Sequence, residues 1–142
     1  FTPDQPFIIG KAIHLKEGND VSIFATGHTV WESLEASKTL QENNINCEVI
    51  NITTIKPLDQ EAILKSIQKT KCAVTCEEHQ ILGGLGSSIA QLTAKQLPVP
   101  IEFVGVNDKF GESGKPMDLM KKYQIDRNSI ANAVINVLKK KI

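Results

Sequence analysis

Two acids and two histidines are the side chains in this sequence best suited to acid–base or metal chemistry. Glu77, Glu78 and His79 follow an apolar run that ends at Thr75, and His28 follows an earlier apolar run. Together they could form an acid–base pair or bind a metal ion. Neighbouring strand residues point to opposite faces, so the two acids can serve one ion only if the strand has already ended. We therefore favour polar contacts at an interface over catalysis or a metal site.

A glycine-rich turn follows these acids and contains Gly83, Gly84 and Gly86, with Ser87 at the start of a predicted helix. Backbone N–H groups at a helix start can hold a phosphate or another anion. The turn lacks the Lys-Ser/Thr pair of a P-loop, and Ile89 stands where a dinucleotide fingerprint needs its third glycine. The alternatives are a small-molecule anion site and a tight strand-to-helix turn packed against a neighbouring domain. We favour the packed turn.

The loop at residues 107–116 is a third candidate, because it combines glycines and charges with an aromatic side chain. Phe110, Ser113 and Lys115 are its candidate contact residues. Loops that follow core strands often carry binding residues. The alternatives are an ordered loop that docks on a partner and a flexible, solvated connector. We favour docking, since an exposed Phe110 would otherwise leave apolar surface bare.

The elements that must position these residues follow from apolar periodicity. Strands are expected at residues 6–15, 21–25, 47–52, 71–75 and 101–106. Helices are expected after Thr29 up to the Asn pair at 43–44, after Asp59, at 84–97, at 116–123 and from Asp126 or Ser129 onward. Strands separated by helices form a parallel sheet, whereas the short link between the first two strands predicts an antiparallel pair. We therefore predict an α/β three-layer sandwich. Its five-stranded sheet is mostly parallel with one antiparallel edge strand, and helices cover both faces.

Polar residues at the helix ends give sharper local predictions. Thr29 with Glu32 three positions later reads as a capping box, and Trp31 is expected in the apolar stripe of that helix. The pair at residues 43–44, Asn-Asn, should end it, because asparagine tolerates the left-handed conformation. Asp59 should cap the next helix.

Overall composition excludes several classes of function. The 142 residues suit one domain, which we place at residues 6–142 after a linker remnant at 1–5. Acidic and basic residues balance at 16 each, which argues against a nucleic-acid partner or a polybasic membrane surface. No apolar run approaches the ~18 residues of a membrane span. The chain begins with Phe1, so we expect a piece cut from a longer protein.

Three cysteines, Cys47, Cys72 and Cys76, make an odd count without disulfide or zinc spacing. Free thiols of this kind are typical of the reducing cytoplasm. Because Cys72 and Cys76 share strand parity with Val74, all three side chains should point to one face of a strand and lie in the core.

Several stretches, taken together, resemble a known family. They are ATGHTV at 25–30, TIKPLD at 54–59, TCEEH at 75–79 with GGLG at 83–86, and SGKP at 113–116 with LMKKY at 119–123 and ID at 125–126. In this order and spacing they resemble the C-terminal domain of transketolase. The resemblance is greater to animal-type and two-subunit transketolases than to deoxyxylulose-phosphate synthase or the β subunit of 2-oxo acid dehydrogenases, which share the domain and remain alternatives.

The resemblance implies a five-stranded mixed α/β sheet within a larger enzyme that moves a two-carbon ketol unit between sugar phosphates. Transketolases use thiamine diphosphate with Mg²⁺ or Ca²⁺, bound between the first two domains of two subunits. The third domain, matched here, helps to build the dimer. The implied partners are the remaining transketolase domains or subunit, in a homo-oligomeric parent. No Gly-Asp-Gly cofactor motif is present, and the Asn pair at 43–44 is not its second half. We therefore expect this fragment to bind no cofactor and to contain no catalytic residue.

Overall fold

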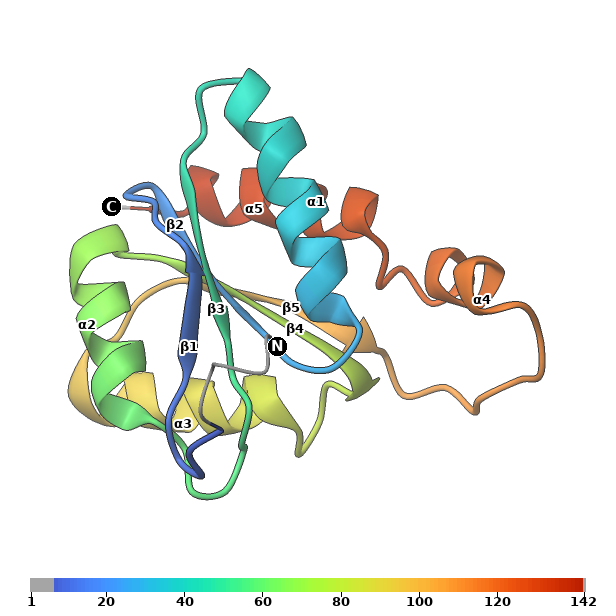
Figure 1. The fold of residues 1–142 in the computed structure, drawn as a ribbon, viewed down its shortest axis with the longest axis horizontal. Helices are drawn as coiled ribbons and strands as arrows, with labels where there is room; N and C mark the ends of the chain where they lie inside the picture. The colour runs from blue at the N-terminus through green and yellow to red at the C-terminus, as the bar shows by residue number, and fades with distance from the viewer. Residues whose placement is uncertain (1–6, 142) are drawn as a thin grey trace.

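The computed structural model describes residues 7–141, so the predicted linker remnant at 1–5 lies outside it. A five-stranded sheet in the order β1-β3-β2-β4-β5 forms the middle layer (Figure 1). The strands are β1 Ile13–Lys16, β2 Val21–Ala25, β3 Cys47–Asn51, β4 Ala73–Gln80 and β5 Ile101–Val106. The helices are α1 Thr29–Glu42, α2 Gln60–Thr70, α3 Leu85–Gln96, α4 Pro116–Lys122 and α5 Arg127–Lys139. Helices α1 and α5 cover one face and α2 and α3 the other, which confirms the predicted three-layer sandwich.

The first strand does not pair as predicted. β1 is the antiparallel edge strand, but it pairs with β3 and not with β2, and Ile13 lies opposite Asn51. Both sides of β2 are already taken by the parallel ladders to β3 and β4. The chain reaches β2 by crossing the start of β3 at Gly18, where a Cβ would lie 2.2 Å from the Cys47 carbonyl carbon. The prediction of a local hairpin was therefore wrong. The parallel pairing of β2 with β3 and β4, which are distant in sequence, sets the strand order instead.

The core lies on both faces of the sheet, and the cysteines belong to it. Cys72, Val74 and Cys76 all lie in the cluster beneath α1 and α5, as their shared parity predicted. All three cysteines are free and buried. Burial raises the pKa of the Cys47 and Cys76 thiols to about 12, so these thiols stay protonated in the folded chain.

The predicted capping box is wrong, although both of its residues form hydrogen bonds to other parts of the domain. Thr29 is the first residue of α1, and its hydroxyl donates to the carbonyls of Thr26 and Cys76. Glu32 instead accepts hydrogen bonds from Arg127 at the start of α5. Trp31 is more than half exposed and does not lie in the core stripe.

The other helix-end predictions are confirmed. Asp59 caps α2, because one of its carboxylate oxygens accepts the N–H of Ala62. Asn44 follows the end of α1 with φ of 60°, the left-handed conformation expected there. Asp126 caps α5 through the N–H of Ser129. In residues 7–141 no helix is both long and apolar enough to cross a membrane.

Candidate functional site

The strand order creates a natural crevice at the carboxyl edge of the sheet. The parallel neighbours β2 and β4 continue into helices on opposite faces, since β2 leads to α1 and β4 leads to α3. In open α/β sheets, ligands bind where the connections of two adjacent strands diverge in this way. Here that point is lined by His28 after β2 and by the last residues of β4. Of the predicted residues, His28, Glu78 and His79 therefore lie at a topological switch point.

Glu77 is turned away from that crevice and holds the glycine turn. β4 runs on to Gln80, five residues beyond the predicted strand at 71–75, so Glu77 and Glu78 point to opposite faces. The buried Glu77 carboxylate accepts the backbone N–H of Leu85 at 2.8 Å and of Gly86 at 2.9 Å. The first N–H groups of α3, which could have held an external phosphate, are thus satisfied by an internal anion.

The glycines and Ser87 fit that internal contact. A Cβ on Gly84 would lie 1.9 Å from the nearer Glu77 oxygen, and one on Gly86 would lie 2.7 Å from the Thr75 hydroxyl. Gly83 has φ of +87°, which favours glycine. Ser87 braces the turn, because its hydroxyl accepts the N–H of Gly83 and donates to the carbonyl of residue 81. The turn is therefore shaped around a side chain of the same domain.

Glu78 and the two histidines form the polar side of the crevice. The Glu78 carboxylate accepts the backbone N–H of His28 at 2.7 Å, which joins the end of β4 to the start of α1. Gly27 has φ of +62° and lies against the same carboxylate. The His79 Nδ1 atom lies 3.8 Å from Glu77, and most of its side chain is exposed. The structure thus brings His28, Glu78 and His79 to one cleft, and His79 also lies beside the Glu77 carboxylate that holds the glycine turn.

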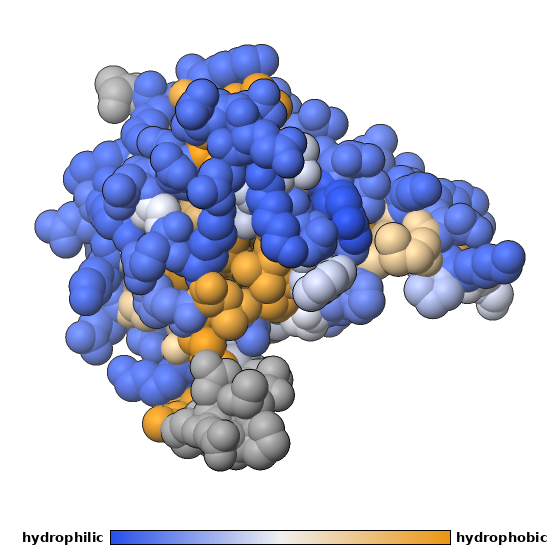
Figure 2. All heavy atoms as spheres, turned by 45° about the horizontal axis from the view of Figure 1, so that its top comes forward, coloured by the Kyte–Doolittle hydropathy of each residue, from blue (hydrophilic) through white to orange (hydrophobic). Residues whose placement is uncertain are grey.

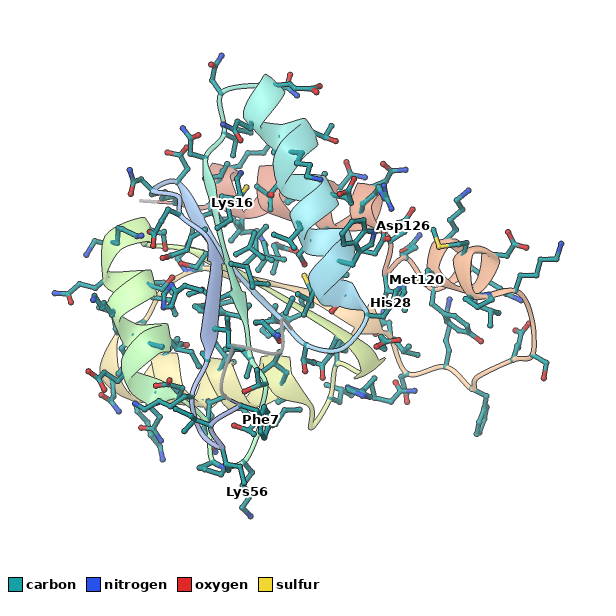
Figure 3. The ribbon with its side chains drawn as sticks, in the orientation of Figure 1. Phe7, Lys16, His28, Lys56, Met120 and Asp126 are labelled. Carbon is teal, nitrogen blue, oxygen red and sulfur yellow. The ribbon has the colours of Figure 1, made fainter. Side chains whose placement is uncertain are left out.

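The cleft lies between the body of the domain and a projecting arm. The arm is residues 107–122, which comprise the predicted docking loop and α4, and it extends away from the sheet (Figure 1). The cleft has a volume of about 550 Å³. His28 and Met120 line it from opposite sides, at the start of α1 and on α4 (Figure 3). Lys109 and Tyr123 add polar groups from the arm side.

The predicted docking loop is held in place by side chains while presenting its aromatic residue to solvent. The amide of Gln80 accepts the N–H of Asp108 and donates to the carbonyl of Lys109. The hydroxyl of Tyr123 donates to the carbonyl of Phe110, whose side chain is 98% exposed. Ser113 and Lys115, the other predicted contact residues, are also exposed, and Lys115 stands at the N-cap position of α4. That the loop docks on a partner remains a prediction.

One cluster of metal-ligand type was not expected from the sequence. Atoms of His14, Glu17 and Glu48, which lie on β1, in the link after it and at the start of β3, are within 4.8 Å of one another. The Lys69 ammonium lies 2.9 Å from Glu48 and 3.3 Å from Glu17. It supplies the positive charge that these carboxylates require, and hydrogen bonds to Glu48 raise the pKa of Lys69. The cluster is therefore an ion-pair network.

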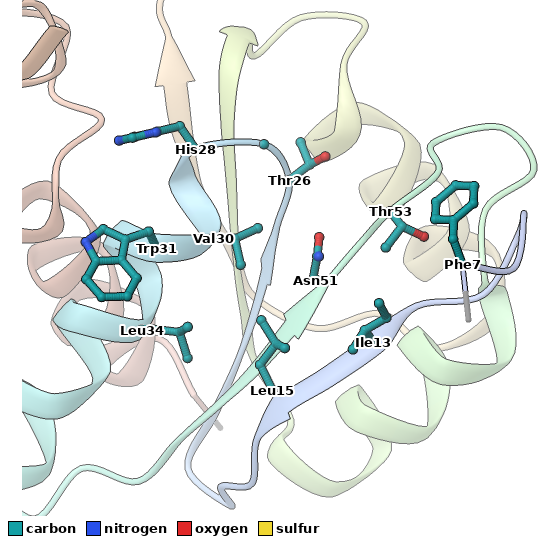
Figure 4. A pocket seen from close by; sticks show the side chains of 11 residues that line it. Phe7, Ile13, Leu15, Thr26, His28, Val30, Trp31, Leu34, Asn51 and Thr53 are labelled. Atoms are coloured by element: carbon teal, nitrogen blue, oxygen red, sulfur yellow. The ribbon is translucent and has the colours of Figure 1, made fainter. Parts of the chain in front are cut away.

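An apolar groove, larger than the cleft at the carboxyl edge, was not predicted from the sequence. It has a volume of about 870 Å³ and lies between the N-terminal segment, β1 and the start of α1 (Figure 4). Figure 2 shows apolar side chains gathered at this place on the surface. The lining residues used below are Phe7, Ile13, Leu15, Val30, Trp31 and Leu34. The signal available in the sequence was the alternation of Ile13 and Leu15 with the polar residues His14 and Lys16.

The comparisons with known proteins point to one family. Residues 10–130 match the family described as transketolase, C-terminal domain. The 6-deoxy-6-sulfo-D-fructose transketolase subunit of a Clostridium species is 43% identical over 138 residues, which cover 97% of this chain and 43% of that protein. The 1-deoxy-D-xylulose-5-phosphate synthase of Caldanaerobacter subterraneus subsp. tengcongensis is 39% identical over 130 residues, which cover 91% of this chain and 21% of that protein.

A solved structure described as a split-gene transketolase, an inactive β4 tetramer, has the same fold throughout. Its TM-score is 0.96 at 40% identity, with 100% of this chain and 46% of that chain covered. The chain therefore spans less than half the length of these relatives.

Proposed function

This chain belongs to the transketolase C-terminal domain family, and from that premise we propose that it is the non-catalytic packing domain of a larger transketolase. The observation that carries the proposal is the extent of the match, which takes in 97% of this chain but only 43% of a transketolase subunit. The parent would transfer a two-carbon ketol unit between sugar phosphates. This domain would support contacts between domains and between subunits.

The polar residues at the carboxyl edge support a packing role. Glu77 is committed to the N-terminus of α3 and Glu78 to the backbone of His28. The buried Glu77 carboxylate is therefore not free to act as a general base on a substrate. The edge is thus built to join strands to helices.

The residues of this chain do not fit the cofactor of the family, thiamine diphosphate with a divalent cation. The Asn pair at 43–44 ends α1 and precedes β3, which places it at the amino edge of the sheet, away from the crevice. The cluster of His14, Glu17 and Glu48 already has the Lys69 ammonium as its cation. We therefore assign cofactor binding to other parts of the parent protein.

The proposed partners are the remaining transketolase domains or subunit, in a homo-oligomeric parent that acts on sugar phosphates in the cytoplasm. A deoxyxylulose-phosphate synthase or a 2-oxo acid dehydrogenase β subunit is the alternative parent, because a synthase shares this domain at 39% identity. The sequence of the gene upstream of Phe1 separates these alternatives. We expect it to encode the remaining domains of a transketolase.

Calorimetric titration tests the packing role directly. The purified chain is titrated with thiamine diphosphate in the presence of Mg²⁺, and the polypeptide with its upstream part serves as the positive control. We expect no binding heat from the chain alone. Micromolar affinity of the chain by itself would refute the proposal.

A second candidate function is recognition of a small phosphorylated molecule in the crevice. It is favoured by one observation, a cleft of about 550 Å³ at the topological switch point that is lined by His28, His79 and Lys109. Nuclear magnetic resonance of the labelled chain with sugar phosphates and nucleotides would test it. Movement of the His28 and His79 signals supports the site. Unmoved signals at these residues and at Gly84–Ser88 exclude it.

A further inference from the structure

The apolar groove is a surface that lacks charge. Among the described residues, its lining contains no Lys, Arg, Asp or Glu, and His28 is its one imidazole. Phe7 and Trp31 leave 57% and 56% of their surface open to solvent, and Leu15 is also exposed. Contiguous apolar surface with large aromatic side chains is typical of an interface and not of a free face. The groove is therefore built to be covered.

The chain itself enters the domain at the rim of this groove. Phe7, the first described residue, lines the groove, and Ile8 and Ile9 beside it are largely exposed (Figure 4). The family is a C-terminal domain, and the transketolase subunit that matches it has more than half of its length outside the match. In a polypeptide with such a domain at its C-terminal end, the part that precedes the domain would connect to it at the edge of the groove.

A tethered partner is favoured over a second copy of this chain. Two free copies must lose translational and rotational freedom when they associate, whereas a short tether holds its partner at an effective concentration on the order of millimolar. The free edge of β1 is also a poor template for another strand. Its register with β3 shifts between His14 and Lys16, and such irregularities blunt an edge against pairing.

We infer that the groove is the docking surface for the part of the same polypeptide that precedes this domain, and that this part covers Trp31 with an apolar surface. The inference rests on the proposed function, because it requires a preceding domain. It goes further by naming the interface and the partner. The contact is formed chiefly by apolar burial, since the groove offers few polar groups for hydrogen bonds.

Trp31 supplies the measurement, because it is the chain's one tryptophan. Acrylamide quenching of Trp31 is compared between the 142-residue chain and the full polypeptide encoded by the same gene. A matched Trp31→Phe variant of the full polypeptide is subtracted to remove the signal of any other tryptophan. We expect quenching to fall severalfold in the full polypeptide, with a blue shift of the Trp31 emission.

Two variants of the full polypeptide locate the contact. Leu15→Thr places a strand-compatible polar residue in the groove and should restore much of the Trp31 quenching. Phe110→Ser changes an exposed apolar residue on the arm, outside the groove, and should leave Trp31 protected. Far-ultraviolet circular dichroism checks that both variants fold. If Leu15→Thr does not fold, Ile13→Thr replaces it.

The outcomes separate the inference from the proposed function. Equal quenching in the short and full polypeptides overturns the inference while leaving a transketolase parent in place. Quenching of the 142-residue chain that falls as its concentration rises assigns the groove to a second copy and also overturns it. An upstream gene sequence that encodes no further domain overturns the proposed function, and the inference with it.

Discussion

The carboxylate of Glu77 accepts the backbone N–H of Gly86 at 2.9 Å, so the end of β4 supplies the anion for the N-terminus of α3. The second carboxylate oxygen accepts the N–H of Leu85. A helix N-terminus carries a partial positive charge and unpaired N–H groups, and a buried carboxylate satisfies both. The strand, the glycine turn and the helix therefore form one unit around this contact.

Glu77→Gln should destabilise the domain by about 1–3 kcal/mol, since it replaces two charge-assisted hydrogen bonds with one neutral bond and turns an amide NH₂ toward the other N–H. Urea denaturation followed by circular dichroism measures the loss. Glu78→Gln is the matched control, because Glu78 is exposed and accepts a single N–H, that of His28. Equal losses in the two variants would contradict the assigned role of Glu77.

The shape of the turn gives a second prediction, for Gly84→Ala. The added methyl would lie 1.9 Å from a Glu77 oxygen, so either the carboxylate or the turn must move. We expect a loss of about 1–3 kcal/mol, the usual cost of overpacking. Gly111→Ala, in a loop where a Cβ meets nothing within 4 Å, should change the free energy of unfolding little. A stable Gly84→Ala protein with wild-type urea midpoint would show that the fit is loose.

Features fixed by neighbouring residues were predictable from the sequence, whereas those fixed by distant residues were not. Asp59 caps α2 and Asn44 ends α1 because each acts on its own backbone within a few residues. The pairing of β1 depends on which strands already pair with β2. Glu32 does not cap its own helix because it binds Arg127, which is 95 residues away in the sequence. The residues next to β1 and next to Glu32 in the sequence do not reveal these distant partners.

The candidate site shows the same division. The sequence correctly placed His28, Glu78 and His79 at one sheet edge, because the carboxyl ends of parallel strands share that edge. It did not reveal that β4 continues through Glu77 and thereby aims this carboxylate at the other face. The apolar groove was missed because exposure of an apolar residue such as Trp31 depends on what packs beside it.

Thr75 offers a test in which a substitution should stabilise the protein. Its buried hydroxyl oxygen has no hydrogen-bond partner among the described residues. Thr75→Val keeps the shape of the side chain and its preference for a strand while removing that polar group. We expect the free energy of unfolding to rise by about 1 kcal/mol. The control is Ser66→Ala, which removes a hydroxyl bonded to Glu48 and should destabilise.

The thiols provide a probe of local opening. Cys47, Cys72 and Cys76 are buried, and burial raises the pKa of each thiol. In the folded chain a reagent therefore cannot reach the sulfur atoms, and the thiols are not ionised to the reactive thiolate. We expect Ellman's reagent at pH 8 to leave the native protein unmodified over minutes and to modify all three thiols in urea. Rapid reaction of one thiol in native buffer would contradict its burial.

The ion pair between Glu32 and Arg127 should make stability depend on pH. Hydrogen bonds from Arg127 hold the pKa of the buried Glu32 carboxyl below its ordinary value of 4.5. The folded state therefore favours the ionised carboxylate more than the unfolded chain does. The resulting stabilisation is fully present above the ordinary pKa of 4.5 and is lost as the pH falls through the lowered pKa of Glu32 in the folded state.

Glu32→Gln tests this dependence, because it removes the titrating group while keeping a side chain of similar size. At pH 7 the variant should be less stable than the wild type by about 1–3 kcal/mol. Below pH ~4.5 the difference should shrink, since the wild-type carboxyl then takes up the proton that the pair had excluded. Urea denaturation from pH 7 to pH 3 measures the two curves, with Glu42→Gln on the exposed end of α1 as control. A difference between wild type and Glu32→Gln that stays constant with pH would mean that α1 and α5 are held together by packing and not by the charge of Glu32.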